Sequence, residues 1–223
     1  FVPEGTVDLG VMQHQLVLTQ QQIEVHSGSE GDVRYTNQDV RGLRYSVDIA
    51  RDAQRFADSA SPDYAARYLT LPPLVSDRVR TLANEITAGA TTSAAKAKAV
   101  ETYLRNKYSY TLSSPSGGKP DPLDHFLFES RAGHCEFFST AMAVMLRAVG
   151  VPTRNVTGLV GGTFNRFGRF YAVRQGDAHS WVEVLLSDDR PRAVWQTYDP
   201  TPVAGTISTS APTGVRGYMT DLV

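Results

Sequence analysis

The chain has a single cysteine, Cys135, among its 223 residues. One cysteine excludes an intramolecular disulfide, so cysteine usage does not tell on which side of a membrane the chain works. Neither sign of charge is in excess: the formal net charge is -1, which argues against a nucleic-acid surface and a polybasic membrane patch. The longest apolar run, around Cys135, is interrupted by Arg147 and is shorter than the roughly 20 residues that cross a bilayer.

The composition is that of a folded globular protein. Hydrophobic residues make up 41% and charged residues 20% of the chain, which excludes a largely disordered protein. The length allows one large domain, or one domain with a smaller one. The chain begins at Phe1 without a signal-peptide pattern, as a mature protein and a fragment both would. We expect a fragment of a longer chain.

The spacing of apolar residues separates a β-rich start from a helical middle. Residues 1 to about 50 are predicted to be β-rich, because apolar and polar side chains alternate over residues 43–49, as in a half-buried strand. From about 51 to 107 the pattern is helical. Ser76 with Asp77 is predicted to cap one helix in that region, and Thr92 or Ser93 is predicted to cap a second.

The second half of the chain is predicted to contain one long helix followed by strands. A flexible loop is expected at 113–122 from its serine, glycine and proline content, and an apolar helix from Cys135 to Gly150. Four strands are predicted after the helix, at 153–160, 169–175, 179–186 and 193–199. Turns are expected between them at Gly161-Gly162 and Gly176-Asp177. Helices before antiparallel strands favour an α+β fold.

Cys135 allows two interpretations. A lone cysteine in an apolar helix is often a small core residue. It also lies where the helix begins, and a helix N-terminus favours negative charge through its unpaired N–H groups and its dipole. A thiol reacts as the thiolate, and the pKa of a free cysteine is about 8.5, so such a position can activate a nucleophile. This stretch alone does not decide between the two.

A histidine and an aspartate follow Cys135 in the order that a Cys-His-Asp site requires. His179 comes 44 residues after Cys135, on a predicted strand, and Asp199 comes 20 residues later at the end of another strand, before Pro200. If these two strands pair, the carboxylate can reach the imidazole, fix its tautomer and stabilise its charged form. Each residue alone also has an ordinary structural explanation, whereas all three together favour nucleophilic acyl transfer.

Three sequence blocks carry a family resemblance. RAGHCEFFSTAMAVMLRAVGVPTRNVTG, DAHSWVEV and WQTYDPTP, in this order, resemble the transglutaminase-like superfamily. ARYLTLPPLVSDRVRTLANEIT, KAKAVETYLRNKYSYTL and DPLDHFLFES are similar to one branch, the bacterial membrane-anchored transglutaminase-like proteins. The resemblance implies a β-rich N-terminal segment (1–62), a papain-like and transglutaminase-like catalytic core (63–205), and a flexible C-terminal tail (206–223). In such a core the cysteine-bearing helix packs on an antiparallel sheet.

The resemblance also implies a set of site residues. Cys135 is expected to be the nucleophile, His179 the base and acid, and Asp199 the residue that orients the histidine. The backbone N–H of Cys135 is the expected oxyanion donor, and such folds are expected to have a second donor upstream. Tyr110 is the candidate for it, with a tyrosine packed on its strand as the alternative. His134 and Trp181 are candidates to line the substrate cleft. The alternatives are an exposed residue at the helix entry for His134 and packing on the strand face for Trp181. No cofactor is expected, and no metal, because the spacing of His125, His134 and Cys135 fits no standard zinc pattern.

The expected activity is acyl transfer through a thioester formed on a protein or peptide carboxamide. Attack by an amine on the thioester gives transglutaminase activity, and attack by water gives a cysteine peptidase or amidase. An inactive binding or scaffold domain is an alternative from another class. The family branch implies a substrate in the cell envelope, a periplasmic or cell-surface location, and membrane attachment only through segments absent from this chain. No nucleic-acid partner is expected, and the sequence does not indicate the oligomeric state.

Overall fold

The computed structural model describes residues 62–113, 115–187 and 193–202, together with five short strands nearer the N-terminus. These are β1 (Thr6–Val11), β2 (Val25–Ser27), β3 (Val33–Tyr35), β4 (Tyr45–Ile49) and β5 (Arg55–Phe56). β4 confirms the strand predicted around residues 43–49, and it pairs antiparallel with β1. The tail predicted at 206–223 lies outside the described residues.

The helices occupy the middle of the chain, as predicted, but they begin later. They are α1 (Pro62–Arg67), α2 (Asp77–Thr87), α3 (Ser93–Lys107), α4 (Pro122–His125), the π-helix η1 (Phe126–Ser130) and α5 (Cys135–Ala148). The predicted helical start at about residue 51 is wrong, because β5 is a strand that completes a sheet. The predicted cap at Ser76 is confirmed, and of Thr92 and Ser93 the structure shows Thr92 as the cap of α3. Ser76 Oγ accepts a hydrogen bond from the Val79 N–H, and Thr92 Oγ1 accepts one from the Ala95 N–H.

The central sheet has four antiparallel strands in the order β5-β12-β11-β8. β8 spans Thr153–Leu159, β11 spans Ala178–Leu186 and β12 spans Val194–Tyr198. The strands predicted at 153–160, 179–186 and 193–199 are therefore confirmed. Neighbours in sequence such as β11 and β12 also pair in space, so the end of β12 lies beside the start of β11. This pairing is what the predicted His179–Asp199 contact requires.

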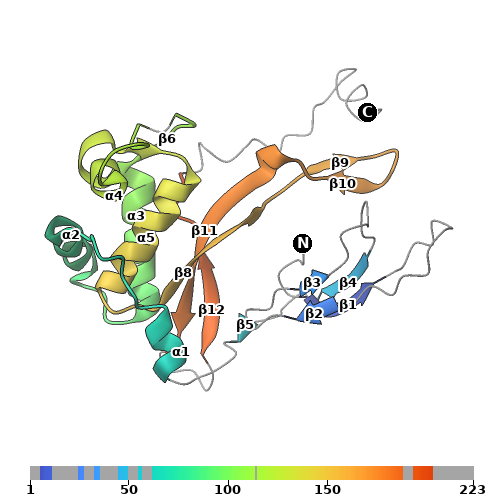
Figure 1. The fold of residues 1–223 in the computed structure, drawn as a ribbon, viewed down its shortest axis with the longest axis horizontal. Coiled ribbons are helices and arrows are strands. Elements are labelled where there is room, and N and C mark those ends of the chain that lie inside the picture. Colours follow the sequence, from blue (N-terminus) through green and yellow to red (C-terminus); the bar gives the residue numbers. More distant parts are fainter. Residues whose placement is uncertain are drawn as a thin grey trace.

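Helices α3 and α5 cover one face of the sheet (Figure 1). The face of α5 toward the core carries Phe138, Met142 and Met145, all fully buried, which is the helical spacing that the sequence predicts. Trp195, outside this main core, packs edge-on against Tyr68, the residue that directly follows the short helix α1. Sheet and helices together confirm the predicted α+β fold.

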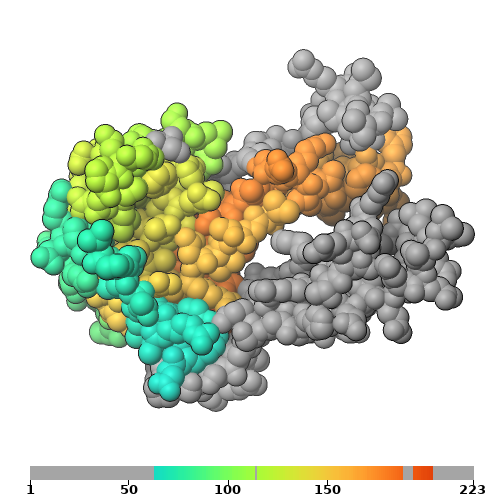
Figure 2. Space-filling model, in the orientation of Figure 1, coloured from blue at the N-terminus to red at the C-terminus, as the bar shows by residue number. Residues whose placement is uncertain are grey.

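The chain between β8 and β11 forms a long arm. β9 (Thr163–Asn165) pairs with β10 (Phe170–Ala172), and this hairpin extends away from the helices (Figures 1 and 2). The turn predicted at Gly161-Gly162 is therefore wrong: the chain reverses only after β9, a strand that the sequence analysis did not predict. Positive φ angles at Gly161 and Gly162, of 94° and 127°, bend the arm where a residue with a side chain would be strained. Gln175–Asp177 forms a 3-10 turn before β11.

None of the helices in the described part of the chain is both long enough and apolar enough to span a bilayer.

Candidate active site

Cys135 is the first residue of the 14-residue helix α5, and a short parallel strand pair fixes the chain just before it. β6 (Ser109–Tyr110) pairs with β7 (Ala132–Gly133), and the Thr111 N–H donates to the Gly133 carbonyl at 2.9 Å. The residue at the N-cap is His134, whose side chain makes no capping hydrogen bond. No capping side chain therefore competes for the N–H groups of the first turn. The Phe137 N–H donates to the His134 carbonyl at 3.0 Å, which leaves the N–H groups of Cys135 and Glu136 for an anion. Cys135 itself is half-buried.

The structure brings His179 and Asp199 into direct contact. His179 lies near the start of β11, and Asp199 directly follows the last residue of β12. The distance from His179 Nε2 to Asp199 Oδ2 is 2.8 Å. Both side chains are partly shielded from solvent, with exposed fractions of 16% and 30%. This is the strand-to-strand contact that the spacing of the two residues predicts.

The electrostatics of His179 join it to both other residues. The hydrogen bond with Asp199 raises the pKa of His179 to about 9 from an ordinary value of 6.5, a hydrogen bond with Cys135 adds to this increase, and burial opposes it. Because Nε2 is engaged by Asp199, Nδ1 is the ring nitrogen left for the thiol. His179 is therefore largely protonated at neutral pH, and a neighbouring imidazolium favours the thiolate form of a cysteine.

Asp199 is held in its charged form. Burial raises its pKa, but hydrogen bonds from His179 and from Thr201 outweigh burial and keep the pKa below the usual value of 3.8. The Thr201 N–H donates to Asp199 Oδ1 at 2.9 Å. With one oxygen bound to the backbone and the other to the imidazole, the carboxylate has a fixed orientation.

Tyr110 and His134 lie on the segments that lead to Cys135. Tyr110 pairs with Gly133. Burial raises the pKa of Tyr110, and an electrostatic interaction with Cys135 raises it further. His134 stacks edge-on against Phe137 at 4.9 Å between ring centroids and is one-quarter exposed.

Trp181 flanks His179 on β11. The ring centroids of the two residues are 6.3 Å apart and their planes differ by 26°. The indole also lies against Gly158 of β8, where an added Cβ would come within 2.7 Å of Trp181 Cη2. In the described part of the chain, the buried indole N–H has no hydrogen-bond partner. The structure thus groups Tyr110, His134 and Trp181 with the three predicted catalytic residues.

Two features around the site were missed by the sequence analysis. Ser139 and Ser180 share a buried hydrogen bond, and Glu101 of α3 accepts a hydrogen bond from the Asp199 backbone. The serines gave no distinctive signal. Glu101 did: it lies within helical spacing of Ala97 and Leu104, which are both fully buried, and an acidic residue at such a position requires a partner.

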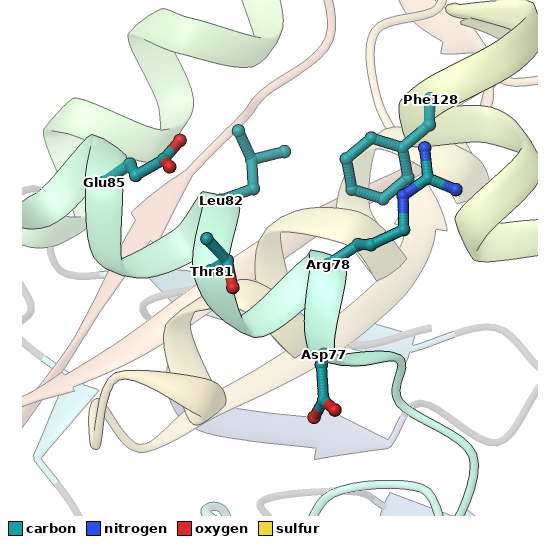
Figure 3. Close-up of a pocket in the computed structure, with 6 residues that line it drawn as sticks. All are labelled: Asp77, Arg78, Thr81, Leu82, Glu85 and Phe128. Carbon is teal, nitrogen blue, oxygen red and sulfur yellow. The ribbon is translucent and has the colours of Figure 1, made fainter.

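A separate hollow of about 350 Å³ lies between α2 and η1 (Figure 3). The Arg78 guanidinium packs 4.0 Å from the ring centroid of Phe128 and forms an ion pair with Asp124. None of the residues that line this hollow belongs to the candidate site: Asp77, Arg78, Thr81, Leu82, Glu85 and Phe128.

Two curated proteins are similar in sequence to this chain. It is 38% identical over 164 residues to the uncharacterized protein YebA of Bacillus subtilis, a match that covers 70% of this chain and 22% of YebA. It is 39% identical over 144 residues to a protein-glutamine gamma-glutamyltransferase of Pseudomonas aeruginosa, covering 64% of this chain and 21% of that protein. The chain thus spans about a fifth of the length of these curated relatives.

The fold is similar to that of a solved bacterial structure. The crystal structure of the periplasmic domain of TgpA from Pseudomonas aeruginosa bound to ethylmercury aligns with a TM-score of 0.68 and 31% identity, covering 89% of this chain and 69% of that chain. Another crystal structure of the same periplasmic domain aligns with a TM-score of 0.57 and 37% identity, over 64% of this chain and 48% of that one. Residues 80–200, more than half of the chain, match the Transglutaminase-like superfamily. The chain therefore belongs to the transglutaminase-like superfamily.

Proposed function

We propose that this chain is a cysteine-dependent acyltransferase of the transglutaminase type, which acts on carboxamide groups of proteins or peptides. One observation carries the proposal: His179 is hydrogen-bonded to Asp199 at 2.8 Å and interacts with Cys135 at the same time. The family assignment and the named gamma-glutamyltransferase relative support the same chemistry.

In the proposed reaction Cys135 is the nucleophile. Its thiolate attacks the carbonyl carbon of a glutamine carboxamide, and the imidazolium of His179 donates a proton to the leaving nitrogen, so ammonia departs as the thioester forms. A primary amine then attacks the thioester while His179 takes a proton from that amine. An isopeptide bond is formed, and the thiolate and imidazolium are restored. Asp199 holds the ring orientation through both steps.

The proposed oxyanion site lies at the start of α5. The Cys135 backbone N–H is one of the first-turn donors of the helix, and it is available to a negatively charged oxygen. We assign the second donor to the Tyr110 hydroxyl, because Tyr110 pairs with the residue that immediately precedes His134. His134 and Trp181 would then flank the entering side chain.

We further propose an extracytoplasmic location and an envelope protein or peptide as substrate. The support is the similarity to the periplasmic domain of TgpA, with 31% identity over 89% of this chain. The substrate proposal follows from that location, since the acyl donor and the amine would have to be present there.

Incorporation of a fluorescent primary amine into a glutamine-containing acceptor protein tests the proposal. The wild-type chain is expected to label the acceptor and release ammonia, whereas Cys135→Ser and His179→Gln should abolish both signals. Mass spectrometry of the acceptor identifies the bond formed. Peptide-bond cleavage without labelling would assign the chain to the peptidase alternative, and neither signal from folded wild-type protein would favour a scaffold domain.

A further inference from the structure

We propose that Glu101 on α3 is a positioning residue, which fixes Asp199 in the place where it can bind His179. The inference rests on the proposed function, because it concerns the same site. It adds a residue from a second helix, α3, to three proposed catalytic residues that come from α5, from β11 and from the end of β12.

The contact is made with the main chain of Asp199. Glu101 Oε1 accepts a hydrogen bond from the Asp199 backbone N–H at 3.1 Å. Asp199 lies one residue beyond the last registered pair of the two strands, Val182 with Tyr198. The next residue, Pro200, has no N–H to donate. Strand pairing therefore no longer fixes the backbone at Asp199. The hydrogen bond from the Asp199 N–H to Glu101 fixes it instead.

Glu101 is itself rigidly held. Its side chain is only 7% exposed, with Lys98 Nζ 2.7 Å from Oε2 and Arg105 Nη2 3.7 Å from Oε1. Residues Ala97 and Leu104, on adjacent turns, are fully buried, so the helix cannot shift easily against the core. The Glu101 carboxylate is thus held in place, and its hydrogen bond fixes the position of the Asp199 backbone.

The position of the Asp199 backbone matters because both oxygens of its side chain already form hydrogen bonds. Oδ2 bonds to His179, and Oδ1 accepts from Thr201. A shift of the Asp199 backbone would lengthen the bond to His179, and misplacement by about 1 Å costs on the order of 100-fold in rate. In the described part of the chain the polar contacts of Glu101 are to Lys98, Arg105 and the Asp199 N–H, so its effect on the site is transmitted through Asp199.

Two variants distinguish the effect of the length of the Glu101 side chain from the effect of its charge. Glu101→Gln keeps the length and an acceptor oxygen but removes the charge, whereas Glu101→Asp keeps the charge but is shorter by one methylene group. If Glu101 acts by positioning, Glu101→Gln should resemble wild type. Glu101→Asp should lower kcat on the order of 100-fold, with little change in KM, and should lower the pKa of His179 from about 9 toward 6.5. If only the ion pairs with Lys98 and Arg105 matter, the order of the two variants should be reversed.

The pKa of His179 is measured by NMR titration of the histidine side chains, and kcat and KM come from the amine-incorporation assay. The same two substitutions at Glu85, which is exposed on α2, serve as controls and should change neither readout. An unchanged His179 pKa in folded Glu101→Asp, or an equal loss in both Glu101 variants, would overturn the inference. Failure of wild type to incorporate amine would instead refute the proposed function, because the NMR readout does not depend on catalysis.

Discussion

The hydroxyl groups of Ser139 and Ser180 lie 2.7 Å apart, although 41 residues separate them in sequence. Ser139 is one helical turn after Cys135, and Ser180 directly follows His179. Both serines are buried, and Ser180 Oγ also lies 3.0 Å from Oδ1 of Asn155 on β8. A buried polar link thus connects the helix of the proposed nucleophile with the strand of the proposed base.

The first prediction concerns the energy of this link. Ser180→Ala leaves the partners of a buried hydroxyl without their hydrogen bond, so it should destabilise the fold by about 1–3 kcal/mol. Ser139→Ala should also be destabilising. Because the two serines share one bond, the double variant should lose less free energy of unfolding than the two single variants combined. Urea unfolding of all four proteins measures this, and strictly additive losses would contradict the proposed coupling.

The second prediction concerns the pH dependence of stability. The pKa of His179 is about 9 in the folded chain, against an ordinary value of 6.5, so folding favours the protonated ring. Its contribution should be fully present below pH 6.5 and should disappear as the pH rises through about 9. Asp199 has a lowered pKa, so the same contact should weaken again at acidic pH, below the ordinary Asp value of 3.8.

Unfolding of wild type and His179→Gln across about pH 2 to 10 checks both parts of this second prediction. The difference in free energy of unfolding should be largest between about pH 4 and 6.5, and at most about 3 kcal/mol. A difference that does not vary with pH would show that the histidine gains nothing from its charge in the folded state.

The third prediction uses the single thiol. If Cys135 is the nucleophile beside His179, as proposed, iodoacetamide should alkylate the native chain at pH 6 much faster than the urea-unfolded chain, in which no neighbouring side chain activates the thiol. In His179→Gln the rate at pH 6 should fall toward that of the unfolded chain. Mass spectrometry follows the reaction without a substrate. Equal rates in wild type and His179→Gln would remove the basis for the thiolate–imidazolium pair.

Local signals in the sequence predict much of the fold. The caps at Ser76 and Thr92 use hydrogen bonds within a few residues, and the buried face of α5 follows from helical periodicity. The sequence also predicts the His179–Asp199 contact. His179 lies on β11 and Asp199 directly follows β12, and these two strands are adjacent in sequence and pair antiparallel.

The errors arise where long-range pairing decides the structure. β5 has only two residues, and it is a strand because it pairs with β12. The paired residues Phe56 and Val194 are 138 positions apart in sequence. A Gly-Gly pair is typical of a turn, but Gly161 and Gly162 form a bend between β8 and β9, after which the chain continues in the arm. The role of Glu101 depends on a backbone N–H that is 98 residues away. No local pattern encodes any of these contacts.

The fourth prediction concerns the contact between Gly158 and Trp181. Gly158→Ala places a methyl group 2.7 Å from Trp181 Cη2, so the indole must move, at a cost of roughly 1–3 kcal/mol. Because the indole flanks His179, amine incorporation should fall as well. Gly176→Ala is the matched control, since nothing lies within 4 Å of its added Cβ. Thermal unfolding and the amine assay measure both effects, and wild-type values for Gly158→Ala would contradict the prediction.

The last prediction concerns the Tyr110 hydroxyl. In the described part of the chain no residue forms a hydrogen bond with it, although the phenol interacts with Cys135, so the hydroxyl is free to bind a substrate oxygen. If it is the second oxyanion donor, Tyr110→Phe should lower kcat by about 100- to 1,000-fold. Tyr171→Phe, which removes the same group from an exposed tyrosine of the arm, should have no effect. Alkylation of Cys135 involves no oxyanion, so its rate should stay at the wild-type level in Tyr110→Phe. A parallel loss of alkylation and amine incorporation would show that Tyr110 supports the thiol itself, and an unchanged kcat would assign the second donor to another group.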